Sequence, residues 1–202
     1  MTILIIARHG NTFESGETPR RVGARTDMNL TAKGLEQGKN LGTHLKTLNL
    51  LPGYIFTSHL KRTIQTAQEI MKAADLSLTP QASDIFNEID YGPDENKIED
   101  EVIARIGAAA IKNWEEHATL PDGWSPDANI IIENWKNFAQ QITKDHPDDT
   151  VLVVTSNGIA RFALNLPDSR QNVDLKLATG AYGILEHTPE TGWAVKGWNI
   201  RP

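Results

Sequence analysis

The side chains best suited to chemistry fall into three short polar clusters. The first is Arg8-His9-Gly10-Asn11-Thr12, the second is Ser58-His59-Leu60-Lys61-Arg62, and the third is Ser156-Asn157-Gly158. An arginine presents a planar fork of N–H donors that matches a phosphate or a carboxylate, and backbone N–H groups at a helix start bind the same kind of group. The clusters therefore indicate a pocket for a small anion.

Each cluster follows directly after a short apolar segment. Residues 2–7, 54–57 and 151–155 are continuous runs rich in β-branched and aromatic residues, which is typical of buried strands. Ligands of open α/β sheets bind beyond the carboxyl ends of the strands. If the three strands are parallel neighbours, the three clusters meet in one crevice.

The remaining elements alternate with these strands. Thr31 is expected to cap a helix that carries Leu35, Leu41, Leu45 and Leu48 on one stripe. Helices are predicted at about 31–48, 60–74, 99–117 and 128–145, and two more strands at 180–186 and 192–199. This alternation predicts an α/β fold, a three-layer α/β/α sandwich with a mostly parallel sheet.

The chain of 202 residues suits a single domain, residues 1–202. Residues 84–127 are irregular and acid-rich, and we expect them to form an insertion over the edge of the sheet. Residues 84–101 hold eight acids against Lys97 alone, and most of these acids are expected to be solvated. Specificity should come from this insertion and from the rim at residues 14–27, which includes Arg20, Arg21 and Arg25.

Composition excludes several classes of function. The net charge of −6 argues against a nucleic-acid or anionic-membrane partner. The absence of cysteine excludes disulfides, thiolate metal sites and cysteine nucleophiles. The apolar start, residues 1–6, is too short for a signal peptide, and no apolar run approaches the roughly 20 residues that span a bilayer. We therefore expect a cytoplasmic protein, and its oligomeric state is left open.

The polar clusters also belong to longer motifs that resemble the histidine phosphatase (phosphoglycerate mutase-like) superfamily. Arg8-His9-Gly10 after the first strand is similar to the signature of the family. The resemblance continues, in the order of the family, at residues 23–34 (G…DMNLTAKG), 57–67 (TSHLKRTIQTA), 88–95 (EIDYG…E) and 153–161 (VVTSNGIAR). The motifs span nearly the whole chain, so the resemblance implies a phosphoglycerate mutase-like fold.

The resemblance implies a role for each matching residue. His9 would be the nucleophile that takes the phosphoryl group as a phosphohistidine. Glu88 would be the general acid that protonates the leaving oxygen and then activates water. The phosphate oxygens would be held by Arg8, Asn11, Arg62, Ser156 and Asn157. These roles are chemically coherent, because nearby guanidinium charges keep an imidazole neutral and stabilise the charge on a transferring phosphoryl group.

The implied function is a phosphatase that hydrolyses phosphomonoesters through His9. No metal and no cofactor are expected, and the partner is a small phosphorylated substrate whose identity the motifs leave open. A phosphomutase is the alternative enzyme. The short chain argues against it, because it leaves little room for a lid that retains an intermediate and excludes water.

One position departs from the pattern of the family. Ser156 stands where the last motif usually carries a second histidine that contacts the phosphate. A hydroxyl donates one hydrogen bond but brings no positive charge. Three outcomes are open: a slower phosphatase, compensation by Asn157 or His59, or a module that binds phosphate without turnover.

Overall fold

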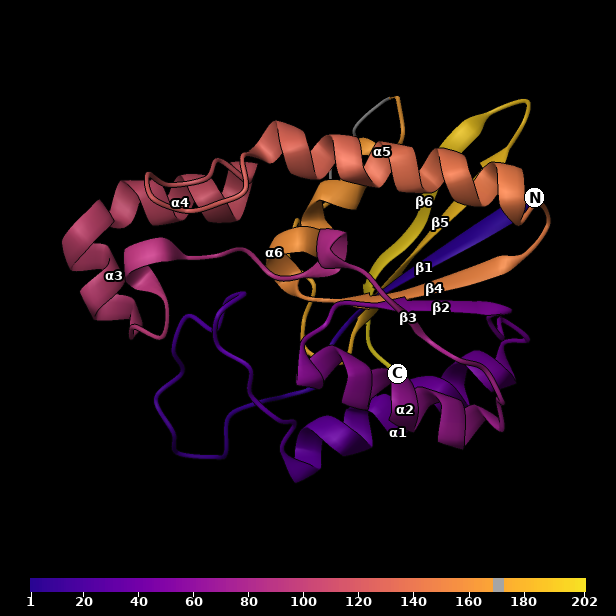
Figure 1. Ribbon diagram of the computed structural model, residues 1–202, viewed down its shortest axis with the longest axis horizontal. Helices are drawn as coiled ribbons and strands as arrows, with labels where there is room; N and C mark the ends of the chain where they lie inside the picture. The colour runs from indigo at the N-terminus through magenta and orange to yellow at the C-terminus, as the bar shows by residue number, and fades with distance from the viewer. Residues whose placement is uncertain (169–172) are drawn as a thin grey trace.

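The computed structural model describes residues 1–168 and 173–202, and its strands form one sheet (Figure 1). The strand order is β3-β2-β4-β1-β5-β6. The strands are β1 (Thr2–Arg8), β2 (Tyr54–Thr57), β3 (Gln81–Ala82), β4 (Thr150–Thr155), β5 (Tyr182–Thr188) and β6 (Gly192–Ile200). The three apolar segments predicted as parallel neighbours are β2, β4 and β1, and they are indeed adjacent and parallel. The pairings of β5 with β1 and with β6 are antiparallel, so the sheet is mixed.

Helices cover both faces of the sheet, which confirms the three-layer prediction. Helices α1 (Ala32–Thr47) and α2 (Lys61–Ala74) lie on one face, and α5 (Ala128–Asp145) and α6 (Asn157–Ala160) lie on the other (Figure 1). Alternate residues of β1 supply the two cores, because successive side chains of a strand point to opposite faces. Ile5 and Ala7 pack with the α1–α2 side, whereas Leu4 and Ile6 belong to the cluster on the α5 side.

Helix α1 is capped as predicted but buries a different stripe. The Thr31 hydroxyl accepts a hydrogen bond from the backbone N–H of Gly34 at 3.1 Å. Leu41 and Leu45 are buried, whereas Leu35 and Leu48 are exposed. Gly38 and Gly42 of α1 face α2, where a Cβ at position 42 would lie 2.4 Å from a backbone oxygen of α2. The close approach of the two helices therefore sets the buried face, and the predicted stripe of four leucines was too wide.

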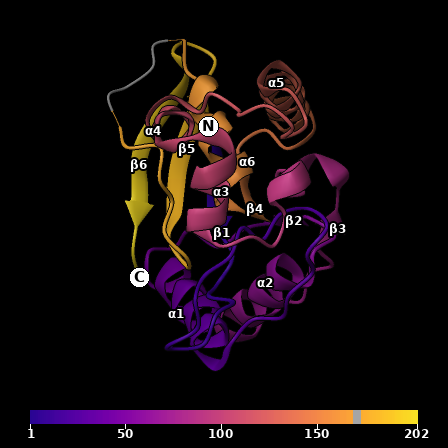
Figure 2. The same cartoon turned by 90° about the vertical axis from the view of Figure 1, so that its left-hand side faces the viewer.

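The predicted helix over residues 99–117 is two helices. Helix α3 (Glu99–Ile106) and helix α4 (Ala108–His117) are separated by Gly107, whose φ of +82° only glycine adopts readily. Both helices extend beyond the carboxyl ends of β1, β2 and β4 (Figure 1). Seen from that end, they lie with the loop from β1 to α1 in front of the strand ends (Figure 2). In residues 1–168 and 173–202, no helix has both the length and the apolar character needed to cross a membrane.

The acid-rich segment is less exposed than expected. Of its eight acids, only Asp84, Glu99, Asp100 and Glu101 are exposed. Asp94 is 1% exposed and accepts hydrogen bonds from Arg105 and from the indole N–H of Trp124. The prediction of a mostly solvated charge run was wrong, because half of these carboxylates bind arginines, backbone N–H groups or a tryptophan within the fold.

Candidate active site

A cavity of about 650 Å³ lies at the carboxyl ends of β1 and β4, between the strand ends and helices α3 and α4. Five of the seven predicted site residues line it: Arg8, His9, Asn11, Glu88 and Asn157. Arg62 and Ser156 are fully buried and lie outside this lining. The fold therefore brings together side chains of the first and third clusters with Glu88, whereas no residue of the second cluster, 58–62, lines the cavity.

His9 is positioned as a neutral ring with one free nitrogen. Its backbone N–H continues the ladder between β1 and β4 by donating to the carbonyl of Thr155 at 2.9 Å. Its Nδ1 lies 2.7 Å from the carbonyl oxygen of Gly10. Because that oxygen can only accept, Nδ1 carries the proton of the neutral ring and Nε2 keeps its lone pair.

Burial, followed by the charges of Arg62 and Arg8, lowers the pKa of His9 well below its ordinary value. The ring is only 6% exposed, so water does little to stabilise its protonated form. His9 is thus held in the protonation state that a nucleophile requires.

Two guanidinium groups, the fully buried Arg62 and the partly buried Arg8, act on His9, and neither forms an ion pair with a carboxylate of the described residues. Arg8 donates from Nη1 to the carbonyl of Leu177 at 2.9 Å, and Arg62 donates from Nη1 to the carbonyl of Thr26 at 2.8 Å. Nε of each arginine is buried and has no partner among residues 1–168 and 173–202. Burial is the main cause that lowers the pKa of both groups. Because a buried charge is costly unless it is paired, this arrangement favours a bound anion.

The carboxylate of Glu88 is held by backbone N–H groups. Its Oε1 accepts from the N–H of Ile89 at 2.9 Å, and its Oε2 accepts from the N–H of Gly158 at 3.2 Å. A Cβ at position 158 would lie 2.2 Å from Oε1, so a larger residue there would displace this carboxylate. The last strand-loop-helix motif therefore also orients Glu88.

The remaining predicted site residues differ in which polar atoms are already hydrogen-bonded within the fold. Ser156 is 0% exposed, and its Oγ has no partner in the described part of the chain. Asn157 lines the cavity while its Oδ1 accepts from the backbone N–H of Leu177 at 2.8 Å. The side-chain nitrogen of Asn11 is bound within its own loop, to the carbonyl of Phe13. His59 is more than half exposed, lies near Asp84 and does not line the cavity, so it is not placed to compensate for Ser156.

The cavity is also lined by Tyr91, Trp114 and Arg161, which the sequence analysis did not single out, and by Arg21 from the predicted rim at 14–27. The spacing along the sequence could have pointed to two of them. Arg161 stands one helical turn beyond Asn157, and Tyr91 stands three residues beyond Glu88. Burial, and then the charge of Glu88, raise the pKa of Tyr91, so this phenol stays protonated. Within the described residues, no group of three or more His, Asp or Glu side chains could hold a metal ion.

Comparison with known proteins places this chain in a family. Residues 4–201 match the model of the histidine phosphatase superfamily (branch 1). A 2,3-bisphosphoglycerate-dependent phosphoglycerate mutase of Bifidobacterium longum is 30% identical over 138 residues, which cover 67% of this chain and 55% of that protein. The chain thus spans about half the length of the first curated relatives it matches. A probable phosphoglycerate mutase of Citrobacter koseri is 29% identical over 99% of this chain and 91% of its own length.

Solved structures share the fold at lower identity. A mycobacterial glucosyl-3-phosphoglycerate phosphatase is 18% identical and superposes with a TM-score of 0.78 over 99% of both chains. A phosphoglycerate mutase from Bacillus anthracis is 20% identical, with a TM-score of 0.81 over 98% of this chain and 92% of that one. These likenesses confirm the predicted phosphoglycerate mutase-like α/β fold.

Proposed function

The chain belongs to branch 1 of the histidine phosphatase superfamily, and on this premise we propose that it hydrolyses small phosphomonoesters through a phosphohistidine on His9, without a metal. One observation carries the proposal. His9 is a buried neutral imidazole whose Nε2 keeps its lone pair, and Arg8 and Arg62 beside it have no carboxylate partner in the described part of the chain. This combination supplies a nucleophile and a cationic cradle for the same phosphoryl group.

The first step is transfer of the phosphoryl group to His9. The lone pair on Nε2 forms a bond to phosphorus while the bond from phosphorus to the leaving oxygen breaks. The leaving oxygen takes a proton from the protonated carboxyl group of Glu88, so the product leaves as a neutral alcohol. Arg8 and Arg62 stabilise the charge that spreads over the other phosphoryl oxygens.

The second step is hydrolysis of the phosphohistidine. The Glu88 carboxylate, now without its proton, removes one proton from a water molecule. The water oxygen attacks phosphorus, the bond to Nε2 breaks, and inorganic phosphate leaves. Glu88 ends with the proton it started with, and the His9 ring is again neutral, so the cycle balances.

The proposal is tested by His9→Ala with p-nitrophenyl phosphate and a panel of phosphorylated metabolites. Loss of the nucleophile is expected to lower kcat by about 10⁴-fold or more. Labelled enzyme quenched during turnover should carry an acid-labile, base-stable phosphoryl group that this variant lacks. His117→Ala is the matched control, because His117 is well exposed and outside the cavity. Equal phosphate release from the His9→Ala variant and the wild type would exclude His9 as the nucleophile.

A phosphomutase is the second candidate, favoured by the names of the curated relatives. The two activities share the phosphohistidine and differ in the acceptor. Incubation of the labelled phosphoenzyme with an excess of an alcohol acceptor separates them: a phosphatase releases inorganic phosphate, and a mutase forms a new phosphomonoester. A chain that binds phosphate and gives neither product would be the binding module that Ser156 suggested.

A further inference from the structure

Arg62 is oriented by backbone carbonyls of the loop that joins β1 to α1. Its Nη1 donates to the carbonyl of Thr26 at 2.8 Å, and its Nη2 donates to the carbonyls of Gly23 at 3.1 Å and Val22 at 3.4 Å. These bonds take three of the five N–H donors of the guanidinium and leave Nε without a partner in the described part of the chain. Because the guanidinium is rigid and planar, the position of the loop fixes the direction of the donors that remain for a phosphoryl group.

Residues 22–26 of this loop are themselves held by one carboxylate, that of Glu95. Its Oε1 accepts from the backbone N–H of Gly23 at 3.0 Å and from the hydroxyl of Thr26 at 2.6 Å. These are two of the three residues whose carbonyls bind Arg62, so Oε1 and the guanidinium hold the same short stretch of chain. A Cβ at position 23 would lie 2.2 Å from Oε2, which shows how closely the loop approaches the carboxylate.

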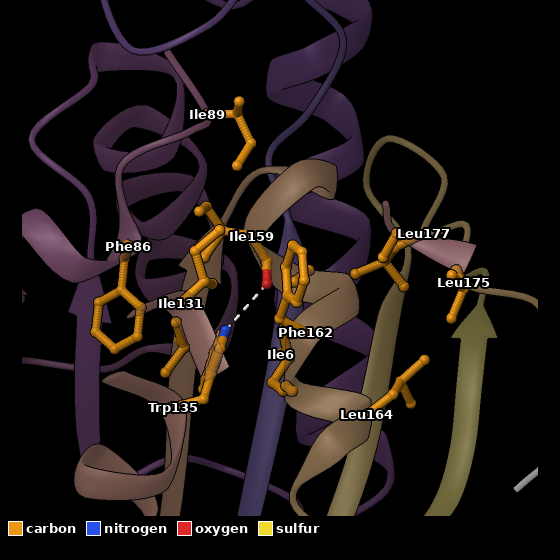
Figure 3. Close-up of a cluster of buried hydrophobic side chains, with 14 of the residues drawn as sticks. Ile6, Phe86, Ile89, Ile131, Trp135, Ile159, Phe162, Leu164, Leu175 and Leu177 are labelled. Carbon is orange, nitrogen blue, oxygen red and sulfur yellow. Dashed lines mark hydrogen bonds between the residues drawn. The ribbon is translucent and has the colours of Figure 1, made fainter. Parts of the chain in front are cut away.

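The other oxygen of Glu95 connects to a segment that is anchored in the core. Oε2 accepts from the backbone N–H of Tyr91 at 3.2 Å, and the Tyr91 ring packs edge-on against Trp124 with the ring centroids 4.6 Å apart. Ile89 is fully buried in the apolar cluster shown in Figure 3, and its carbonyl accepts from the N–H of Ala24 at 3.0 Å. Glu95 therefore joins the loop to a segment that cannot move without disturbing the core.

The motif over residues 88–95 begins and ends with a glutamate, and the proposed function uses only the first. Glu95 does not line the cavity, so it can act on the reaction only through other side chains. Hydrogen bonds to a carboxylate are about twice as strong as those between neutral groups. Resting on the proposed function, in which Arg62 stabilises the transferring phosphoryl group, we propose that Glu95 is a positioning residue. Its hydrogen bonds hold the carbonyls of Gly23 and Thr26 where they orient the Arg62 guanidinium.

The proposal is tested by a double-mutant cycle between Glu95→Ala and Arg62→Met, with p-nitrophenyl phosphate as the substrate. Glu95→Ala alone should lower kcat/KM by about 10-fold, because a displaced loop turns the guanidinium away from the phosphoryl group. In the Arg62→Met background the same substitution should change kcat/KM by less than about twofold, because the group that Glu95 positions is gone. An equal fold-loss in the two backgrounds overturns the proposal. A smaller folded fraction lowers both backgrounds alike, so it cannot imitate the expected result.

Two more variants test which hydrogen bonds of Glu95 matter. Glu95→Gln keeps one oxygen that can accept from Gly23 and Thr26, so it should retain more than about a third of the wild-type kcat/KM. Thr26→Val removes one donor to Oε1 but keeps the carbonyl that binds Arg62, and it should lower kcat/KM by about threefold. It takes the place of Glu95→Ala in the cycle if the alanine variant does not fold. A glutamine variant as impaired as the alanine variant would show that these hydrogen bonds do not orient Arg62.

Glu101→Ala is the matched control for Glu95→Ala. Glu101 belongs to the same acid-rich segment, and its carboxylate also accepts from a backbone N–H, that of Ile98 at 3.2 Å. Its other partner is the exposed Lys97, so neither of these bonds reaches residues 22–26. Its kcat/KM should equal that of the wild type. A loss as large as that of Glu95→Ala would mean that any disturbance of the segment lowers activity, and the proposal would fail.

A second substrate distinguishes Arg62 from Glu88 as the group that Glu95 positions. p-Nitrophenolate leaves with little help from an acid, whereas the best alkyl phosphate of the metabolite panel needs the proton of Glu88. The fold-loss in Glu95→Ala should be the same for both substrates, and a loss confined to the alkyl phosphate overturns the proposal. Turnover that survives His9→Ala, or wild-type turnover in Arg62→Met, overturns the proposed function instead.

Discussion

The two walls of the cavity are held in different ways. At the strand ends His9 continues the β ladder, and behind them the buried Arg62 donates to the carbonyls of Thr26 and Gly23, so backbone groups fix the reactive side chains. On the opposite side, backbone hydrogen bonds between Arg21 and residues 96–97 are supplemented by side-chain ion pairs. Arg21–Glu99 at 2.8 Å and Arg25–Asp90 at 3.0 Å join the loop before α1 to residues 90–99, and Arg105–Asp94 lies within the segment that faces this loop.

These two kinds of contact distinguish the side chains that react from the segment expected to determine specificity. Backbone partners persist when neighbouring side chains change, so the reactive wall keeps its geometry across sequences that share the fold. Ion pairs depend on the identity of both partners, so the opposite wall can be rebuilt by a few substitutions. The reactive wall should therefore respond to mutation mainly in activity, and the opposite wall mainly in stability.

The largest expected effect comes from the reactive wall. Arg62→Met removes a buried cation that acts on the same phosphoryl oxygens as Arg8, and kcat/KM should fall by about 10²- to 10³-fold. Lys61→Gln, an exposed neighbour on α2, is the matched control and should keep wild-type activity. A fall of similar size in both variants would mean that the start of α2, rather than the guanidinium, is needed.

The same variant has a second readout in the pH profile. The lowered pKa of His9 means that activity is lost only when the pH falls below the ordinary histidine range, because the protonated ring has no lone pair. Without the Arg62 charge, the pKa of His9 rises and the acid limb of kcat/KM against pH moves to higher pH. An acid limb that stays in place would mean that Arg62 does not act on His9.

An intermediate effect is expected on the opposite wall. Burial alone would raise the pKa of Asp94, but hydrogen bonds from Arg105 and Trp124 outweigh it and hold the pKa below its ordinary value. Arg105→Met leaves this buried carboxylate short of partners and should lower the free energy of unfolding by about 2 kcal/mol in urea denaturation. Arg25→Met removes one member of a more exposed pair and should lower the free energy of unfolding by much less. Equal losses of unfolding free energy in the two variants would mean that burial of an ion pair does not determine how much it stabilises the fold.

The smallest effect is expected at Ser156, which directly follows β4 and carries no charge. Its buried Oγ has no partner among the described residues, and we expect it to donate to a bound phosphate. Ser156→Ala should lower kcat/KM by about 3- to 10-fold, as expected for the loss of one neutral hydrogen bond. The midpoint of unfolding should stay nearly unchanged. Unchanged kcat/KM together with higher stability would show that the hydroxyl takes no part in the reaction.

Local sequence predicted the reactive wall well. The apolar runs before Arg8 and Ser156 gave the central parallel strands, and the polar residues at the ends of these strands met as expected. A strand buried on both faces has a strong composition signal, and the sheet then fixes where its end lies. The stripe of α1 and the break at Gly107 were predicted less well, because they depend on close packing and on a single backbone angle.

The sequence by itself determined which side chains stand at the strand ends and hence the kind of chemistry the site can support. Only the tertiary structure decided which charges are paired. Arg21 and Glu99 are 78 positions apart, and no periodicity couples them. Likewise, the burial of Arg161 follows from the contact of the segment after α6 with Trp114 of α4. Short-range patterns record backbone conformation, whereas the pairing of charges is set by contacts between segments that meet only when the chain has folded.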